Sequence, residues 1–413
     1  MSSKKITDAA WKLMTTWKGP KPLQGFLSHI DALMMAAHIK KNFSARVDFR
    51  KAIIKDAEEV GKKEVLNILA AYLKASSIPK EEWPELDFVG FAAGEGDYRG
   101  TVDPNLKNLN LRPNDPQEST VFHLIPQQIV LRWEKHKRIY VIWPGTDFSR
   151  PREGTISTGL TISQILTHMI IGGFPDDLNA GQSETIASIL GSPVGGDPSE
   201  VTAIRSVVNC LTANISVDGK KVFPSTIEQT AAFASKYTVP EGWEVDHIGH
   251  SLGCALMPVP AVHYAKYWPK AKHHMLSFAP WLTYSREAAE VIGKLFPGPM
   301  FTFIDYDDPV AQFAGISQTF YDMLVRGGKY GMLRSNRYPL GRVFRYSVLA
   351  DSINPAIHHL LGCIRKAFEK MEAVNLDEFE ASSLLRSCGT KAPVIDVTQK
   401  SLEQVVDDWV DKK

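Results

Sequence analysis

The stretch that decides the fold is VDHIGHSLGCALMP, residues 245–258, which holds a serine between two glycines. The run WEVDHIG (243–249) predicts a strand, and the residues after Ser251 predict a helix. A serine at a sharp strand-to-helix turn is typical of a nucleophile, because Gly249 and Gly253 leave room for the turn to close. The G-x-S-x-G pattern alone arises often by chance. The alternative is therefore a serine that only completes a tight turn.

The composition excludes several classes of protein. The chain has 413 residues, 44% hydrophobic and 23% charged, as in ordinary soluble domains, and its net charge of +1 predicts no nucleic-acid partner. The polar start MSSKKITDAAWKL has no signal-peptide pattern, and no apolar run reaches membrane-spanning length. We therefore expect a cytoplasmic or non-classically secreted protein. The four scattered cysteines indicate buried thiols rather than a zinc site or a disulfide scaffold.

Along the chain, the pattern changes from helical to alternating. Residues 1–90 predict helices, and the Gly-, Asp- and Pro-rich segment 85–118 predicts a loop. From about residue 120, apolar runs typical of strands alternate with helical segments, which predicts an α/β domain with a largely parallel sheet. One continuous helix is expected after Ser251. The tail 371–413 ends in an acidic segment that predicts a surface helix.

A serine hydroxyl needs a base to activate it and an acid to orient that base. When the serine lies on such a turn, the acid and then the histidine follow it in the chain. Two downstream segments, MFTFIDYDDPV (300–310) and DSINPAIHHLLGCI (351–364), supply three candidate acids and two candidate bases: Asp305, Asp307, Asp308, His358 and His359.

Three motifs in this order, YVIWPGTD (140–147), GHSLG (249–253) and DDPV (307–310), resemble those of the lipase class 3 family, the fungal-type triacylglycerol lipases. The resemblance covers about residues 120–370. It implies an α/β-hydrolase fold, with a mostly parallel central sheet flanked by helices. We expect this domain at 91–370, with an insert at about 148–226, a helical N-terminal extension at 1–90 and a helical C-terminal tail at 371–413. Pro144 and Cys254 depart from the family pattern and mark a divergent member.

The resemblance also implies roles for individual residues. Ser251 matches the nucleophile and Asp308 the acid, with Asp307 and Asp305 as weaker alternatives. The histidine is doubled, and His359 is only slightly favoured over His358. For the oxyanion hole, the residue after the serine, Leu252, provides one backbone N–H, and the family pattern places Thr146 as the second donor. The alternative for Thr146 is a plain strand-ending turn. No cofactor or metal is expected.

A possible lid lies in the insert. GLTISQILTHMIIGGF (159–174) places its apolar residues on one face of a predicted helix at 161–171: Ile162, Ile165, Leu166, Met169 and Ile170. In the family, a helix in this position covers the serine and moves at a lipid surface. A helix packed permanently on the core is the alternative.

The leading functional hypothesis is a serine ester hydrolase that acts on lipid acyl esters without a cofactor. A phospholipase or a short-chain carboxylesterase would use the same residues. A non-catalytic lipase-like module, which binds a partner through the N-terminal helices and the acidic tail, is the alternative from another class. Oligomeric state, acyl chain length and head-group preference are left open.

Overall fold

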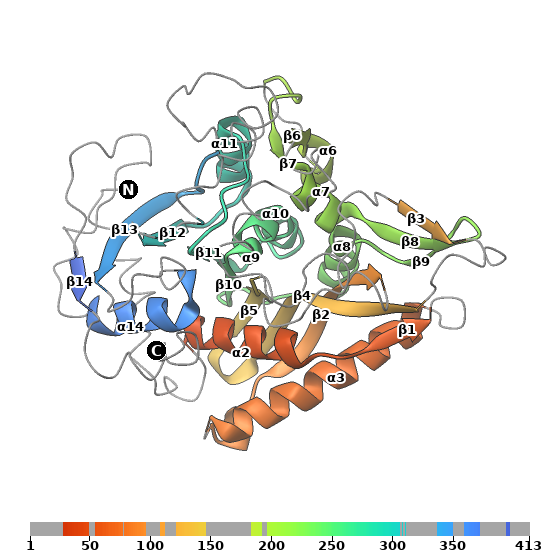
Figure 1. The fold of residues 1–413 in the computed structure, drawn as a ribbon, viewed down its shortest axis with the longest axis horizontal. Helices are drawn as coiled ribbons and strands as arrows, with labels where there is room; N and C mark the ends of the chain where they lie inside the picture. The colour runs from red at the N-terminus through yellow and green to blue at the C-terminus, as the bar shows by residue number, and fades with distance from the viewer. Residues whose placement is uncertain are drawn as a thin grey trace, which may run out of the picture.

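A central β-sheet organises the computed structural model, which describes residues 28–48, 54–76, 78–95, 108–111, 121–145, 183–191, 196–305, 308, 310, 337–349, 359–371 and 394–396. Nine strands of this described part form the sheet, in the order β1-β4-β5-β10-β11-β12-β13-β14, with β2 also paired to β4 (Figure 1). Their bounds are β1 Arg46–Asp48, β2 Glu85–Glu95, β4 Val121–Trp133, β5 Arg138–Trp143, β10 Glu244–His250, β11 Lys272–Phe278, β12 Met300–Asp305, β13 Arg342–Leu349 and β14 Val394–Asp396.

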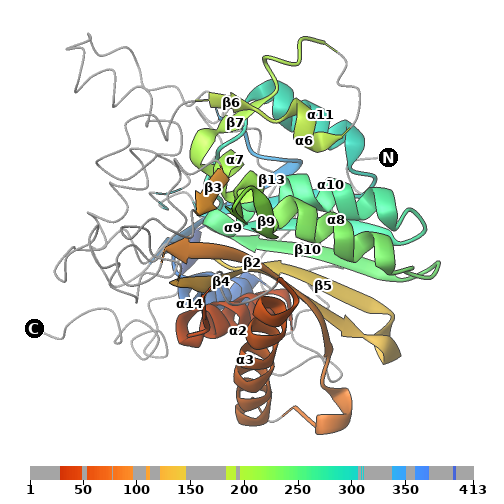
Figure 2. The same cartoon turned by 90° about the vertical axis from the view of Figure 1, so that its right-hand side faces the viewer.

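The sheet is parallel from β5 through β14, and the antiparallel strands β1, β2 and β4 lie at one end. Helices cover both faces (Figure 2). On one face lie α2 (His29–Asn42), α3 (Ile54–Ala75) and α14 (Leu361–Met371). On the other lie α7 (Arg205–Thr212), α8 (Thr226–Lys236), α9 (Leu252–Leu256), α10 (Pro258–Tyr267) and α11 (Arg286–Leu295). No helix in the described ranges is both long and apolar enough to cross a bilayer.

Each face of the sheet has its own hydrophobic core. In β5, Tyr140 and Ile142 pack toward α2 and α3, whereas Val141 and Trp143 pack toward the opposite helices. Successive side chains of a strand point to opposite faces, so a strand covered on both sides is largely apolar. This explains the apolar run of β5 in the sequence, whereas β10 also carries the buried polar residues Asp246, His247 and His250. The predicted fold class is confirmed: a mostly parallel sheet flanked by helices, with a serine at a strand-to-helix turn, is the α/β-hydrolase fold.

Local sequence explains where the helices begin. Ser225 caps α8, and with Glu228 it forms a capping box. The single helix expected after Ser251 is instead two helices, α9 and α10, because Pro258 has no N–H to continue the hydrogen bonding and starts a new helix.

The N-terminal region differs from the sequence prediction in its strands. Helices α2 and α3 agree with the helical prediction, but β1 and β2 are strands, and the expected boundary at residue 90 falls inside β2. The predicted loop 85–118 contains β2 and also β3 (Asn108–Leu111). Pairing with β4 and burial of Val89 and Phe91 stabilise β2 despite its glycines, so tertiary contacts override the local composition.

The insert and the tail are described in part. Between β5 and α8 the structure shows β6 (Ser183–Thr185), α6 (Ala187–Leu190), β7 (Thr202–Ile204), α7, β8 (Asn214–Val217) and β9 (Lys220–Phe223). The predicted lid helix at 161–171 lies outside the described residues, as does the acidic end of the tail. In the tail, expected to be helical, β14 is a strand that extends the sheet beside β13.

Candidate active site

Ser251 occupies the turn between β10 and α9 in a backbone conformation that residues other than glycine rarely adopt. Its φ is 54° and its ψ is −122°, and holding a non-glycine residue in such a region costs about 1–3 kcal/mol. Backbone hydrogen bonds hold the turn: the Ser251 N–H donates to the Phe278 carbonyl (3.2 Å), and the Ser251 carbonyl accepts from Trp281 N–H (3.3 Å). The turn therefore presents the serine under constraint, as the sequence context predicted.

The two glycines of the motif are required by close backbone contacts. A Cβ on Gly253 would lie 1.9 Å from the Trp143 carbonyl oxygen, and one on Gly249 would lie 2.9 Å from the Cys254 nitrogen. Real Cβ atoms do not approach backbone so closely, so both positions need glycine. The start of α9 is thereby held directly against the end of β5.

The structure brings Ser251, His359 and Asp308 together from three distant parts of the chain. His359 Nε2 lies 2.7 Å from Ser251 Oγ, and His359 Nδ1 lies 3.0 Å and 3.1 Å from the two carboxylate oxygens of Asp308. All three are buried, with exposed fractions of 0% for Ser251 and Asp308 and 3% for His359. Since Asp308 accepts from Nδ1–H, the lone pair of Nε2 faces the serine hydroxyl.

Asp308 is fixed just beyond β12. Its N–H donates to the Asp305 carbonyl (3.1 Å), and its Oδ1 accepts from the Val310 N–H (2.9 Å). Asp305 itself ends β12 and is buried, and it contributes this backbone contact to the site. The two other candidates from the sequence, Asp307 and His358, lie outside the described residues.

His250 is a site residue that sequence reasoning missed. Its Nε2 lies 2.9 Å from the His359 carbonyl oxygen, and the two rings are 5.0 Å apart. Burial, and next the neighbouring His359, lower the pKa of His250 to about 3, so it is neutral and donates its Nε2–H to that carbonyl. Its place directly before Ser251 was the available signal.

The region expected to stabilise an oxyanion lies beside the serine. Leu252 is the first residue of α9 and follows Ser251 directly. A Cβ on Gly145 would lie 3.1 Å from Ser251 Cβ and 2.7 Å from His250 Nδ1, so the chain after β5 contacts the turn at Ser251. The Gly145 carbonyl accepts a hydrogen bond (3.0 Å) from Lys40 of α2, a second residue that sequence reasoning missed. Thr146 lies outside the described residues.

Cys254, which departs from the family pattern three residues after Ser251, is buried in the turn. Its thiol donates to the Phe278 carbonyl (3.4 Å), the same carbonyl that accepts from Ser251 N–H. Burial strongly raises the pKa of this thiol, so it stays protonated and helps to hold β11 against the turn. This agrees with the prediction of a buried thiol.

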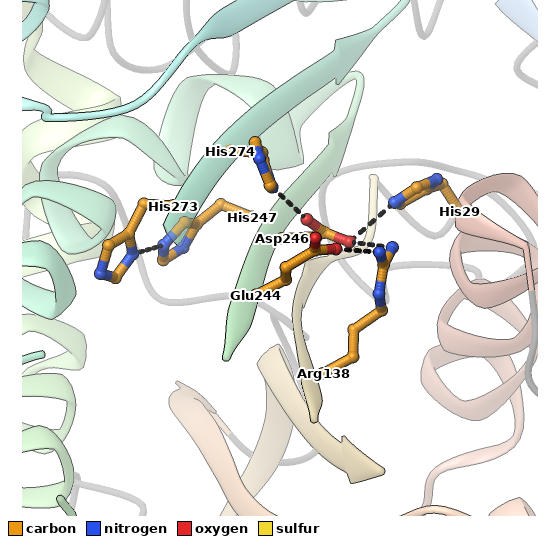
Figure 3. A network of polar contacts seen from close by, with 7 residues as sticks. All are labelled: His29, Arg138, Glu244, Asp246, His247, His273 and His274. Carbon is orange, nitrogen blue, oxygen red and sulfur yellow. Dashed lines mark hydrogen bonds and ion pairs between the residues drawn. The ribbon is translucent and has the colours of Figure 1, made fainter. Parts of the chain in front are cut away.

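A buried polar network lies at the opposite end of the strands (Figure 3). Asp246 of β10 contacts His29 (2.9 Å), Arg138 (2.9 Å) and His274 (2.7 Å), and Arg138 also pairs with Glu244. Burial alone would raise the pKa of Asp246, but hydrogen bonds from His274 and His29 and the charge of Arg138 hold it well below its usual range. The network fastens the start of α2 to the sheet.

Of the comparisons with known proteins, only the one with solved structures finds similar proteins. No family model matches the sequence, and no curated protein matches it. Among solved structures, M37 lipase is similar at 12% identity and a TM-score of 0.38, over 86% of this chain and 94% of that one. A Rhizomucor miehei triacylglyceride lipase is similar at 11% identity and a TM-score of 0.36, over 77% and 80%. A Penicillium expansum triacylglycerol lipase is similar at 16% identity and a TM-score of 0.31. The match covers 53% of this chain and 63% of the length of that lipase.

Proposed function

We propose that this protein is a serine hydrolase of carboxylic esters, with Ser251 as the nucleophile, His359 as the general base and Asp308 as the residue that orients it. The observation that carries the proposal is the pair of hydrogen bonds at His359, 2.7 Å to Ser251 Oγ and 3.0 Å to Asp308. A serine with its base and acid in hydrogen-bond reach is the requirement for nucleophilic acyl transfer. The constrained backbone of Ser251 supports the same role.

The proposed reaction has two acyl-transfer steps. Ser251 Oγ attacks the ester carbonyl carbon while His359 Nε2 takes the hydroxyl proton. The tetrahedral intermediate collapses as His359 gives this proton to the departing alcohol, which leaves an acyl-serine. Water then attacks the acyl-serine with the same histidine as base, and the carboxylic acid is released with free Ser251. Asp308 keeps Nδ1 protonated throughout, so that Nε2 stays available.

Negative charge on the attacked carbonyl oxygen needs hydrogen-bond donors. We assign the Leu252 N–H to this role because it follows the nucleophile at the first position of α9. Thr146 is the second proposed donor, from the motif resemblance, and the backbone of Gly145 beside Ser251 supports an oxyanion site on this side.

The proposed substrates are lipid acyl esters. This class comes from the resemblance of the YVIWPGTD, GHSLG and DDPV motifs to triacylglycerol lipases, and the helical spacing of apolar residues in the sequence of 161–171 supports transient contact with a lipid surface. Phospholipase and short-chain esterase activity would use the same three residues.

Hydrolysis of p-nitrophenyl esters from acetate to palmitate by the wild type tests the proposal. The matched serine control is S235A, on the exposed surface of α8. We expect the S251A variant to lose hydrolysis at every chain length and S235A to retain it. Preference for long chains would favour the lipid class. Activity limited to acetate and butyrate would support a short-chain esterase, and hydrolysis of phosphatidylcholine a phospholipase.

A further inference from the structure

Lys40 is a buried lysine of α2 whose side chain contacts the backbone beside the turn at Ser251. It lies in the last turn of α2, and only 7% of its surface is exposed. Lysines are almost never so buried, because removing an ammonium from water is costly unless hydrogen bonds compensate. Lys40 Nζ donates to the Gly145 carbonyl oxygen at 3.0 Å. The chain therefore places a buried charge on this particular carbonyl.

The Gly145 carbonyl belongs to the backbone that lies directly beside Ser251. The backbone at Gly145 is packed against Ser251 and His250, as the Cβ distances of 3.1 Å and 2.7 Å show. A peptide bond is planar, so a hydrogen bond to the Gly145 carbonyl oxygen fixes the plane of the whole peptide group. A charged donor makes this hydrogen bond stronger than a neutral donor would.

Contacts at the first turn of α2 hold this helix in place, and the helix in turn fixes the position of Lys40. At its first turn, His29 binds Asp246 (2.9 Å) and stacks on Tyr140 of β5 (Figure 3 shows the His29–Asp246 contact). Asp31 pairs with Arg365 of α14 (3.2 Å), the helix that begins two residues after His359. The helix is thus tied to the sheet and to the element that follows the proposed base.

We propose that Lys40 is a positioning residue of the proposed ester hydrolase: its ammonium holds the Gly145 peptide group beside Ser251 in the orientation that acyl transfer requires. The proposal rests on the proposed function. It makes α2 part of the active-site architecture, because the helix carries the donor.

The test compares K40M, which removes the donor at similar length, with the conservative variant K40R and the matched control K41M. Lys41 neighbours Lys40 on α2 and is exposed. We expect kcat of K40M for a p-nitrophenyl ester to fall about 10- to 100-fold, somewhat less than for loss of an oxyanion donor itself, with KM changed less than about twofold. K40R should recover most of kcat, and K41M should behave as the wild type. The labelling rate of Ser251 by a fluorophosphonate should fall in parallel with kcat.

Thermal unfolding of each variant separates positioning from folding. Should K40M not fold, K40Q, whose side chain is uncharged and one bond shorter, takes its place with the same expected loss of kcat. A kcat within about twofold of wild type in the folded variant overturns the role of Lys40 and leaves the hydrolase proposal intact. A loss of activity that only matches the unfolded fraction overturns it equally. A wild type that neither hydrolyses any ester nor reacts with the phosphonate overturns both proposals.

Discussion

His359 Nε2 lies 2.7 Å from Ser251 Oγ, although 108 residues separate the two in the chain. The ring is held on its other side by Asp308, and its backbone carbonyl is held by His250. A histidine held by these three contacts needs no rearrangement to act as the proposed base, because it is already in position to accept the serine proton.

Replacing the proposed base, His359, should distinguish its role from that of the neighbouring His358. We expect H359Q to lower kcat by about 10³-fold or more, because glutamine cannot accept the serine proton. H358Q is the matched control and should keep kcat within a few-fold of wild type. Steady-state kinetics on a soluble p-nitrophenyl ester measures both. A larger loss of kcat in H358Q than in H359Q would show that His358, and not His359, is the base.

Replacing the acid should act through the orientation of His359. In D308N, an amide can donate to Nδ1 and stabilise the tautomer whose Nε2 carries a proton, so kcat should fall by about 10⁴-fold. The Val310 N–H bond to Asp308 Oδ1 is preserved by the asparagine oxygen, which protects the fold. Circular dichroism checks folding. A folded D308N within tenfold of wild type would show that Asp308 does not orient the base.

The turn around Ser251 should not tolerate a side chain at Gly253. G253A would place a Cβ 1.9 Å from the Trp143 carbonyl oxygen, so we expect a loss of at least about 4 kcal/mol in the free energy of unfolding. The control is G293A in α11, where the nearest atom is Met300 Cε at 3.5 Å and alanine should stabilise the helix by about 0.5–1 kcal/mol. Urea unfolding measures both changes, and equal stability of the two variants would contradict the described turn.

Acid should destabilise the protein through buried histidines. Burial lowers the pKa of His247, His250 and His273, and that of His250 falls to about 3. Below pH ~6.5 the unfolded chain binds protons that the native state does not, so stability falls as the pH decreases toward the native pKa values. Each such histidine contributes up to about 1.4 kcal/mol per pH unit.

Urea unfolding between pH 8 and pH 5 checks this expectation. The free energy of unfolding should be nearly level above pH ~7 and should fall steeply below pH ~6. H250Q removes one of these groups, so its slope below pH 6 should be smaller by about 1.4 kcal/mol per pH unit. A level profile from pH 7 to pH 5 would mean that these histidines are not buried in their neutral form.

The sequence predicts the centre of the molecule well because the relevant signals are local. The strands β5 and β12 are short and mostly apolar, as expected of strands covered on both faces of a sheet. The turn at Ser251 is also readable, since the two glycines are needed by contacts within a few residues and with the end of β5.

Contacts between distant segments were not predictable. The Lys40–Gly145 and His250–His359 hydrogen bonds join residues 105 and 109 positions apart, and no periodicity in the sequence marks them. Lys40 follows the pattern of an ordinary basic residue in the last turn of a helix. Strand β2 was missed for a related reason: its pairing with β4 stabilises a glycine-containing segment whose composition indicates a loop.

The most direct test of the central claim is reaction of the wild type and S251A with a labelled fluorophosphonate, followed by peptide mapping, with ester hydrolysis measured on the same samples. The proposed function predicts one covalent adduct, on Ser251, loss of ester hydrolysis in step with labelling, and neither labelling nor hydrolysis in S251A. Wild-type protein that is not labelled at Ser251, or hydrolysis that persists unchanged in S251A, would contradict it.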